Sequence, residues 1–188
     1  MSIIIVSDIF GKTPALDKLC HAIAPDIKII DPYSGKFMDF QNEHMAYEYF
    51  MKQVGLNDYC QVIKSVLNKK LSPVILIGFS VGGSAIWKIF ESLNRKQVKH
   101  MFCFYSSQIR HSQKINPSCK VDFVMPAYEP DFSIEELSEQ LLTKENVTIH
   151  NTSYLHGFMN KFSENFNQSG YNKYVDWLQK MLDKQIKT

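Results

Sequence analysis

The chain has 188 residues, of which 45% are hydrophobic and 21% charged, a length and composition typical of one folded domain with a sizeable core. Its 21 basic and 19 acidic side chains give a formal net charge of +2 without a dense basic block, which argues against a nucleic-acid partner. No apolar stretch approaches the roughly 20 residues that cross a bilayer, and no cleavable leader is evident, so we expect a cytoplasmic protein without a membrane partner.

Strand-like and helix-like segments alternate from the N-terminus onward. In chain order we expect a strand at Ser2–Val6, a helix, a strand at Ile27–Asp31, a loop at Tyr33–Gln41, helices at about Glu43–Val54 and Asp58–Lys69, and a strand at Val74–Ile77. Thr13 and Pro14 are the residue types preferred at the N-cap and first position of the first helix. Asn57 is the predicted N-cap of the third helix.

The same alternation continues to the C-terminus. We expect a helix at Ser84–Leu93, a strand at Val98–Tyr105, a polar loop at Ser106–Ser118, a strand at Val121–Met125, a helix at Ile134–Thr143 capped by Ser133, a strand at Val147–Asn151, and a final helix with an apolar face from Tyr171 to Ile186. Because no repeat or linker interrupts the pattern, it predicts a single α/β domain over residues 1–188, with a mostly parallel sheet and helices on both faces.

The four cysteines give no sign of a cross-link or a metal site. Cys20, Cys60, Cys103 and Cys119 lie far apart in the chain and form no C-x-x-C pair. The first three also fall within apolar patterns. We therefore predict buried free thiols.

The segment Pro73–Gly83 carries the strongest functional signal. Its apolar run ends in a G-x-S-x-G pattern centred on Ser80 and leads into a predicted helix. A tight strand-to-helix turn of this kind exposes the serine hydroxyl, and the helix N-terminus directs amides at the place where an oxyanion would form. The pattern predicts a nucleophile elbow; a glycine-rich turn with an ordinary serine is the alternative. The phosphate-loop motifs are absent from the chain.

An activated serine needs a base and an acid beyond the carboxyl ends of the strands. His156 is the best candidate for the base, because it follows the last predicted strand by five residues and immediately precedes Gly157. A surface loop histidine is the alternative. The acid should follow Val121–Met125, where Glu129 is preferred because it lies four residues before the helix cap. Asp131 is the second candidate, although it can equally face the positive end of the helix dipole.

Two further features complete the predicted site. The amide of Val81 directly follows the nucleophile, and a second oxyanion donor should come from the loop Ser7–Gly11. Arg110 lies in the loop after the strand Val98–Tyr105, on the edge of the sheet where substrates bind. It could grip a substrate carboxylate. A solvated loop arginine is the alternative that we favour.

Four of these segments together resemble the dienelactone hydrolase branch of the α/β-hydrolases. The loop Asp8-Ile9-Phe10-Gly11 resembles that family's acidic-Ile-Phe-Gly loop, and Gly78–Gly83 resembles its G-[FY]-[CS]-x-G-G elbow. Val121–Ser133 is similar to the strand and loop that carry the family's acid, and His156-Gly157-Phe158 matches its H-G-F signature. The four motifs span the chain from residue 8 to residue 158.

The resemblance implies a compact α/β-hydrolase fold with a Ser-acid-His triad. Its members would be Ser80, Glu129 and His156. The amides of Ile9 and Val81 would form the oxyanion hole.

The chain departs from this family in three ways. Serine stands at position 80, where the name-giving members have cysteine, and glutamate replaces aspartate at position 129. The chain also begins at what resembles the third strand, so the leading strands are expected to be missing. Asp8 would occupy the place of the family's acidic residue beside the nucleophile. These departures favour generic ester hydrolysis over dienelactone turnover.

We therefore expect a serine hydrolase that cleaves a small-molecule ester or thioester through an acyl-enzyme on Ser80, with no metal and no organic cofactor. An acyltransferase or a thioesterase would use the same residues. Two alternatives belong to other classes: a non-catalytic ligand-binding protein on the same fold, and a flavodoxin-like nucleotide-binding protein. The sequence leaves the natural substrate, the pathway and the oligomeric state open.

Overall fold

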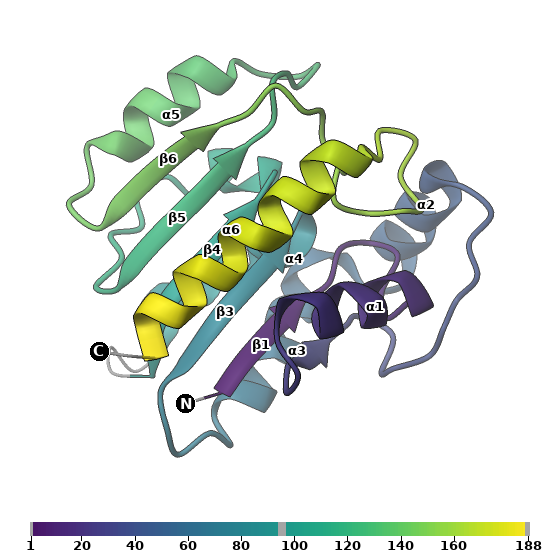
Figure 1. The fold of residues 1–188 in the computed structure, drawn as a ribbon, viewed down its shortest axis with the longest axis horizontal. Helices are drawn as coiled ribbons and strands as arrows, with labels where there is room; N and C mark the ends of the chain where they lie inside the picture. Colours follow the sequence, from purple (N-terminus) through teal and green to yellow (C-terminus); the bar gives the residue numbers. More distant parts are fainter. Residues whose placement is uncertain (1, 94–96, 187–188) are drawn as a thin grey trace.

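The computed structural model describes residues 2–93 and 97–186, which form one sheet of six strands with helices around it. The strands are β1 (Ser2–Val6), β2 (Lys28–Ile30), β3 (Val74–Phe79), β4 (Val98–Phe104), β5 (Lys120–Met125) and β6 (Val147–Asn151). They lie in the order β2-β1-β3-β4-β5-β6, and each neighbouring pair is parallel (Figure 1). The predicted parallel sheet is confirmed, and the carboxyl ends of its strands share one edge.

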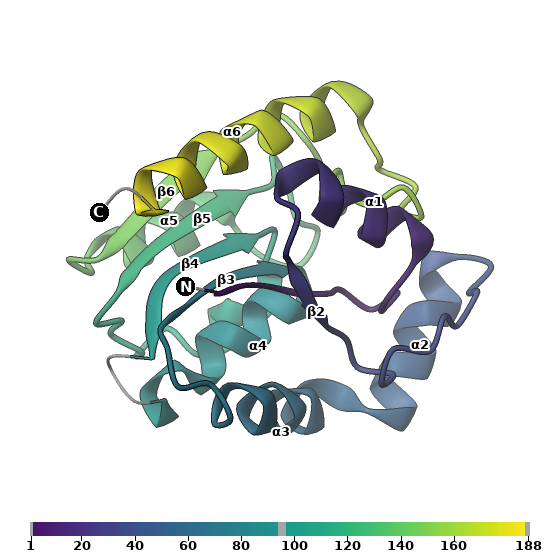
Figure 2. The same cartoon turned by 60° about the horizontal axis from the view of Figure 1, so that its bottom comes forward.

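Helices cover both faces of this sheet, as the alternation predicts (Figures 1 and 2). One face carries α1 (Pro14–Ile23) and α6 (Gln168–Ile186). The other carries α2 (Glu43–Gln53), α3 (Gly55–Leu67), α4 (Val81–Ile89) and α5 (Ile134–Leu142). Two short 3-10 helices, η1 (Phe90–Ser92) and η2 (Ser107–His111), follow α4 and β4.

The sheet has a hydrophobic core on each side, because alternate residues of a strand point to opposite faces. In β1, Ile5 belongs to the core beneath α1 and α6, whereas Ile4 and Val6 belong to the core beneath α3 and α4. All three side chains are fully buried. β3 is buried along its whole length, since strands flank it on both sides and helices cover both faces. The candidate nucleophile follows directly on this rigid strand.

Two of the predicted helix caps are confirmed. The Thr13 hydroxyl accepts a hydrogen bond from the Leu16 amide at 3.1 Å, and Pro14 is the first residue of α1. The Ser133 hydroxyl accepts from the Glu136 amide at 3.1 Å at the start of α5. Each cap satisfies an amide that has no partner inside its helix.

Three local predictions need correction. The predicted cap at Asn57 is wrong, because Gly55, with a φ of +70°, allows a sharp break after α2 and α3 begins there. Asn57 lies inside α3, where its side-chain oxygen accepts a hydrogen bond from Lys88 at 2.9 Å. The helix after the elbow begins at Val81 instead of Ser84, and η2 occupies part of the predicted polar loop.

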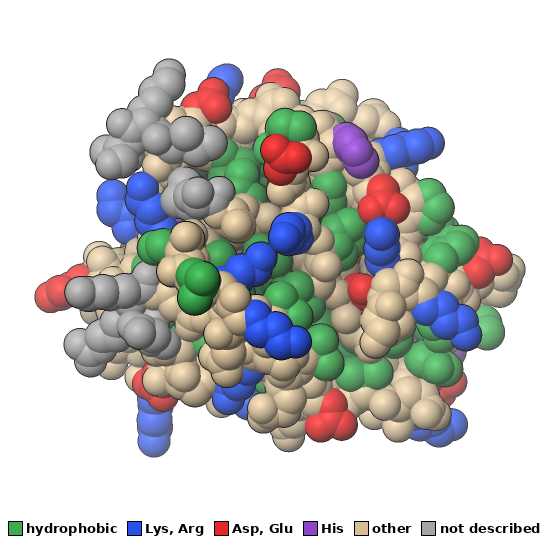
Figure 3. All heavy atoms as spheres, turned by 90° about the horizontal axis from the view of Figure 1, so that it is seen from below, with side chains coloured by type: hydrophobic (Ala, Val, Ile, Leu, Met, Phe, Trp, Pro, Cys, Tyr) green, Lys and Arg blue, Asp and Glu red, His purple; other side chains and the backbone are tan. Residues whose placement is uncertain are grey.

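The predicted state of the cysteines is confirmed: all four are free and buried. Burial raises the pKa of the Cys20 and Cys119 thiols to about 12. On the surface, basic and acidic side chains are interspersed with apolar ones over the face seen in Figure 3. No helix in the described ranges is long and apolar enough to span a membrane.

A hydrogen-bonded network centred on the buried Asp122 lies beneath α6, on the side of the sheet away from α4. Asp122 of β5 accepts hydrogen bonds from His100 Nε2 of β4 at 2.5 Å and from His150 Nε2 of β6 at 2.6 Å. Burial raises the pKa of the Asp122 carboxyl, but the two histidines outweigh this effect and bring the pKa to about 2. The rings of His100 and His150 pack against Phe102 and Trp177 respectively. The network ties three neighbouring strands together.

Candidate active site

Ser80 stands at the turn between β3 and α4, where the chain changes direction sharply. Its φ of +50° and ψ of −116° lie in a region that residues other than glycine rarely adopt, the strained backbone expected of a nucleophile elbow. Glycines allow the close approach that the turn needs. A Cβ at Gly82 would lie 2.4 Å from the carbonyl oxygens of Val6 and Ser7, and one at Gly78 would meet the α4 backbone at 2.4 Å.

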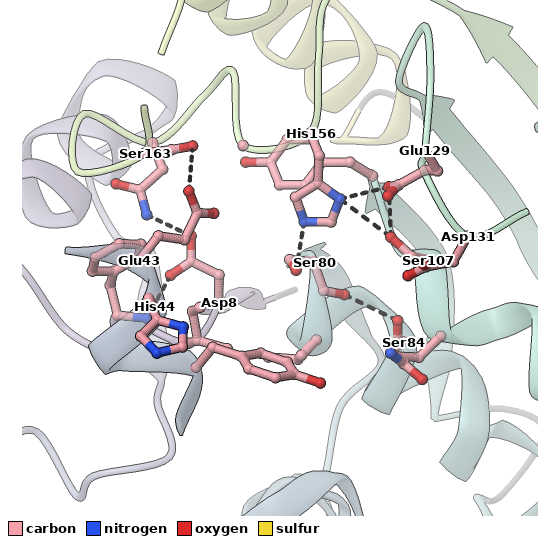
Figure 4. Close-up of a pocket in the computed structure, with 18 of the residues that line it drawn as sticks. Asp8, Glu43, His44, Ser80, Ser84, Ser107, Glu129, Asp131, His156 and Ser163 are labelled. Carbon is pink, nitrogen blue, oxygen red and sulfur yellow. Dashed lines mark hydrogen bonds and ion pairs between the residues drawn. The ribbon is translucent and has the colours of Figure 1, made fainter. Parts of the chain in front are cut away.

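Three side chains from three separate loops meet at the carboxyl edge of the sheet (Figure 4). Ser80 Oγ lies 2.9 Å from His156 Nε2, and His156 Nδ1 lies 2.6 Å from Glu129 Oε1. Glu129 belongs to the β5–α5 loop and His156 to the β6–α6 loop. Because the ionised carboxylate accepts a hydrogen bond from the Nδ1–H group, Nε2 is left without a proton and can accept one from the Ser80 hydroxyl. The three groups are thus aligned for proton transfer away from the serine.

Glu129 is held by more than the imidazole. Ser107, the first residue of η2, donates from its hydroxyl to Glu129 Oε1 at 2.6 Å, and the same hydroxyl lies 3.2 Å from His156 Nδ1. Burial raises the pKa of the Glu129 carboxyl, but the hydrogen bonds from His156 and Ser107 and the charges of His156 and Arg110 hold it below its ordinary value. The carboxylate is therefore ionised at neutral pH.

The two amides predicted for the oxyanion hole belong to residues that line the same pocket. Val81 is the first residue of α4, so its N–H has no acceptor within the helix. The Ile9 N–H and the Asp8 carbonyl belong to the same planar peptide group. That carbonyl accepts a hydrogen bond from the Gly11 amide at 3.1 Å. The Tyr33 hydroxyl donates to the Ile9 carbonyl at 2.7 Å. The two peptide groups that flank Ile9 are thus held by hydrogen bonds in advance of any ligand.

A pocket of about 350 Å³ opens beside Ser80 and His156. One side of it carries Asp8 and Glu43, and Asn160 Nδ2 donates to Asp8 Oδ2 at 2.6 Å (Figure 4). Burial raises the pKa of the Asp8 carboxyl to about 6, with a further contribution from the negative charge of Glu43 and opposition from the hydrogen bonds that Asp8 accepts. Asp8 therefore changes its charge close to neutral pH.

The remaining predicted residues lie at the edge of this pocket. Asp131, the second candidate for the acid, lines the pocket but is exposed, and the carboxylate hydrogen-bonded to His156 is that of Glu129. Arg110 also lines the pocket, with its guanidinium 4.8 Å above the ring of Phe132. Within residues 2–93 and 97–186, no group of three or more His, Cys, Asp or Glu side chains is arranged to hold a metal ion.

Three polar residues of the site were not identified from the sequence. Ser107 lies in the predicted polar loop Ser106–Ser118, where nothing in the sequence distinguishes it from its neighbours, and Glu43 is the first residue of α2. Asn160 follows the His-Gly-Phe signature by two residues, and this proximity was the only signal available for it. Each reaches the site through tertiary structure, which spacing along the chain does not encode.

Comparison with known proteins identifies one relative by sequence. No protein-family model matches the chain. YczH of Bacillus subtilis (strain 168), described as an uncharacterized protein, is 30% identical over 151 residues, which cover 79% of this chain and 73% of that protein.

Solved structures with this fold are more numerous and much more distant in sequence. Mouse alpha/beta hydrolase domain-containing protein 10 matches 98% of this chain and 90% of its own, with a TM-score of 0.68 and 12% identity. Est1E from Butyrivibrio proteoclasticus matches 99% of this chain and 88% of its own, with a TM-score of 0.66 and 11% identity.

A dienelactone hydrolase-like promiscuous phosphotriesterase, P91 from metagenomic libraries, matches 97% of this chain and 85% of its own, with a TM-score of 0.65 and 9% identity. At these identities the likeness establishes the fold, and at that level the resemblance to dienelactone hydrolase-like proteins is confirmed. The chain thus has the α/β-hydrolase fold and belongs to the same family as YczH of Bacillus subtilis.

Proposed function

We propose that the chain is a serine hydrolase that cleaves small ester or thioester substrates through an acyl-enzyme on Ser80. One observation carries this proposal: the hydroxyl, imidazole and carboxylate of Ser80, His156 and Glu129 are linked by contacts of 2.9 and 2.6 Å. The fold adds support, since the solved structures that share it include esterases and other hydrolases.

In this reaction Ser80 attacks the acyl carbonyl while His156 Nε2 accepts its proton. The Glu129 carboxylate orients the ring and stabilises the imidazolium that forms. The negative charge that develops on the acyl oxygen is received by the amides of Ile9 and Val81, each worth on the order of 3 kcal/mol in such sites. His156 then protonates the leaving group, and a water molecule activated by the same imidazole hydrolyses the acyl-enzyme.

The dimensions of the pocket favour a small substrate. Its volume of about 350 Å³ is near the lower limit of ligand pockets, which run from about 300 to 1,000 Å³. His44 and Tyr47 of α2 also line the pocket, and His44 lies on the side away from Glu129 (Figure 4), so α2 bounds the space for the substrate. We expect short acyl chains to be preferred over long ones.

A fluorophosphonate probe tests the proposal directly, because it reacts with an activated serine. The wild type should become labelled, and Ser80→Ala should not. A series of p-nitrophenyl esters of increasing acyl length, with Ser80→Ala and His156→Ala as controls, then measures turnover and chain-length preference.

The other outcomes identify the alternatives. A wild type that binds esters but neither labels nor turns them over would be a ligand-binding protein on this fold. Acyl transfer to an acceptor other than water, detected by product analysis, would make the protein an acyltransferase. Bound flavin without a probe adduct would point to a nucleotide-binding protein.

A further inference from the structure

The Ser107 hydroxyl contacts two members of the candidate triad, yet the reaction described above gives it no part. We propose that Ser107 is a positioning residue that fixes the Glu129 carboxylate against His156. The inference rests on the proposed function, since it assigns Ser107 to the same reaction. It concerns how the acid is held, and it leaves the roles of the nucleophile and the base unchanged.

The geometry around the carboxylate is a closed triangle (Figure 4). Ser107 Oγ lies 2.6 Å from Glu129 Oε1 and 3.2 Å from His156 Nδ1, and these last two atoms are 2.6 Å apart. Since Nδ1 carries the proton directed at the carboxylate, the single hydroxyl proton of Ser107 is directed there too. One carboxylate oxygen thus accepts two charge-assisted hydrogen bonds from different parts of the chain.

The length of the glutamate side chain explains why a second anchor is needed. Glutamate has one more rotatable bond than aspartate, so holding its carboxylate in one place costs more conformational entropy. The side chains of Ala127, Tyr128 and Pro130 are exposed, and the Ala127 amide anchors the loop backbone by donating to the Tyr154 carbonyl at 2.7 Å. That bond lies two residues away and does not fix the side-chain torsions of Glu129. The carboxylate itself is well enclosed, with 10% of the Glu129 side chain exposed. The position of the carboxylate is therefore fixed by the two side chains that reach it from elsewhere, His156 and Ser107.

Ser107 is itself held firmly enough to serve as an anchor. Its amide donates to the Tyr105 carbonyl at 3.1 Å, and its carbonyl accepts from Arg110 Nη1 at 2.8 Å. The Arg110 guanidinium lies over Phe132, which belongs to the same β5–α5 loop as Glu129. η2 is therefore attached to the loop of the acid at two points.

Ser107→Ala tests this role. We expect kcat to fall by about 10- to 100-fold with little change in KM, because small displacements of catalytic groups have effects of this size and Ser107 acts through Glu129. Because the carboxylate loses a donor that stabilises its charged form, the pKa of the Glu129 carboxyl should rise and the acid limb of the pH–rate profile should move to higher pH. Ser107→Thr keeps the hydroxyl and should restore most of the activity.

Matched variants separate positioning from structural damage. Ser112→Ala, at the end of the same turn, should leave kcat and the pH profile unchanged. Ser107→Cys keeps the size of the side chain but is a weak donor, so it should lose activity without losing thermal stability. In a Glu129→Ala background, Ser107→Ala should cause no further loss, because the group through which it acts is gone.

Two results would overturn the inference alone: a Ser107→Ala protein with wild-type kcat and pH profile, or an undiminished additional loss in the Glu129→Ala background. Either would leave the proposed function intact, provided that the wild type labels with the probe and turns over esters. A wild type that does neither would overturn both.

Discussion

Replacing Glu129 by glutamine keeps the size of the side chain and removes its charge, so it tests the candidate acid most directly. When His156 takes the serine proton, the imidazolium faces the carboxylate across the 2.6 Å contact between Nδ1 and Oε1. With charge centres about 4 Å apart and an effective dielectric constant of about 20, their attraction is about 4 kcal/mol. Because about 1.4 kcal/mol corresponds to a factor of ten, kcat should fall by about 1,000-fold.

The assay is steady-state hydrolysis of p-nitrophenyl acetate by the wild type, Glu129→Gln and Asp131→Asn, with the melting temperature of each as a control for folding. Asp131→Asn is the matched variant, since this carboxylate lies two residues further along the same loop and is exposed. It should lose far less activity. A Glu129→Gln protein that is folded and loses less than about tenfold would refute the electrostatic reasoning. A larger loss in Asp131→Asn would reassign the acid.

Four further predictions concern the rest of the chain. Gly82→Ala should lower the melting temperature sharply, because its Cβ would lie 2.4 Å from two carbonyl oxygens; unchanged thermal unfolding would contradict the packing of the elbow. Asp122→Asn should lower the free energy of unfolding, measured in urea at pH 7, by about 2 kcal/mol. This difference should disappear as the pH falls from about 4 through about 2, because the pKa of Asp122 is lower in the folded than in the unfolded protein. A pH-independent difference would argue against the ion pairs. Asp8 has a folded-state pKa raised to about 6, so the melting temperature of Asp8→Asn relative to the wild type should rise between pH 4 and pH 8. If the melting temperature of Asp8→Asn instead fell relative to that of the wild type, folding would lower the pKa of Asp8 and not raise it. The four buried thiols should react with Ellman's reagent slowly in the native protein and rapidly in guanidinium chloride. Fast native reaction would show an accessible cysteine.

The elements of the fold were largely predictable because local chemistry fixes them. Thr13 and Ser133 cap helices with their own hydroxyls, and the unbroken apolar run of β3 is typical of a strand covered on both faces. The prediction that Asn57 caps α3 was wrong because Gly55 adopts a positive φ and α3 begins there. Glycine can adopt this conformation but does not have to, so the sequence alone does not predict it.

The site was predictable only in part, for a similar reason. Ser80 lies in a strand-to-helix turn whose conformation depends on the residues of the motif itself. His156 and Glu129 were predicted from the rule that parallel strands place their carboxyl ends at one edge of the sheet. Ser107 depends on the 3-10 turn of η2 and on a contact made across 22 residues. Likewise, the pairing of Asp122 with His100 depends on the register of β4 and β5, which alternation along one strand does not define.

The loops that carry the three candidate catalytic side chains follow β3, β5 and β6, and the short turn at residues 143–146 separates the last loop from the other two. Opening the backbone in this turn would leave the nucleophile and the acid in one fragment and the imidazole in the other. If the assigned chemistry holds, neither piece could hydrolyse an ester efficiently alone, and parallel pairing of β6 with β5 would reunite them. Release of p-nitrophenol by the mixture would then report, by colour, how completely two separate polypeptides reassemble around one sheet.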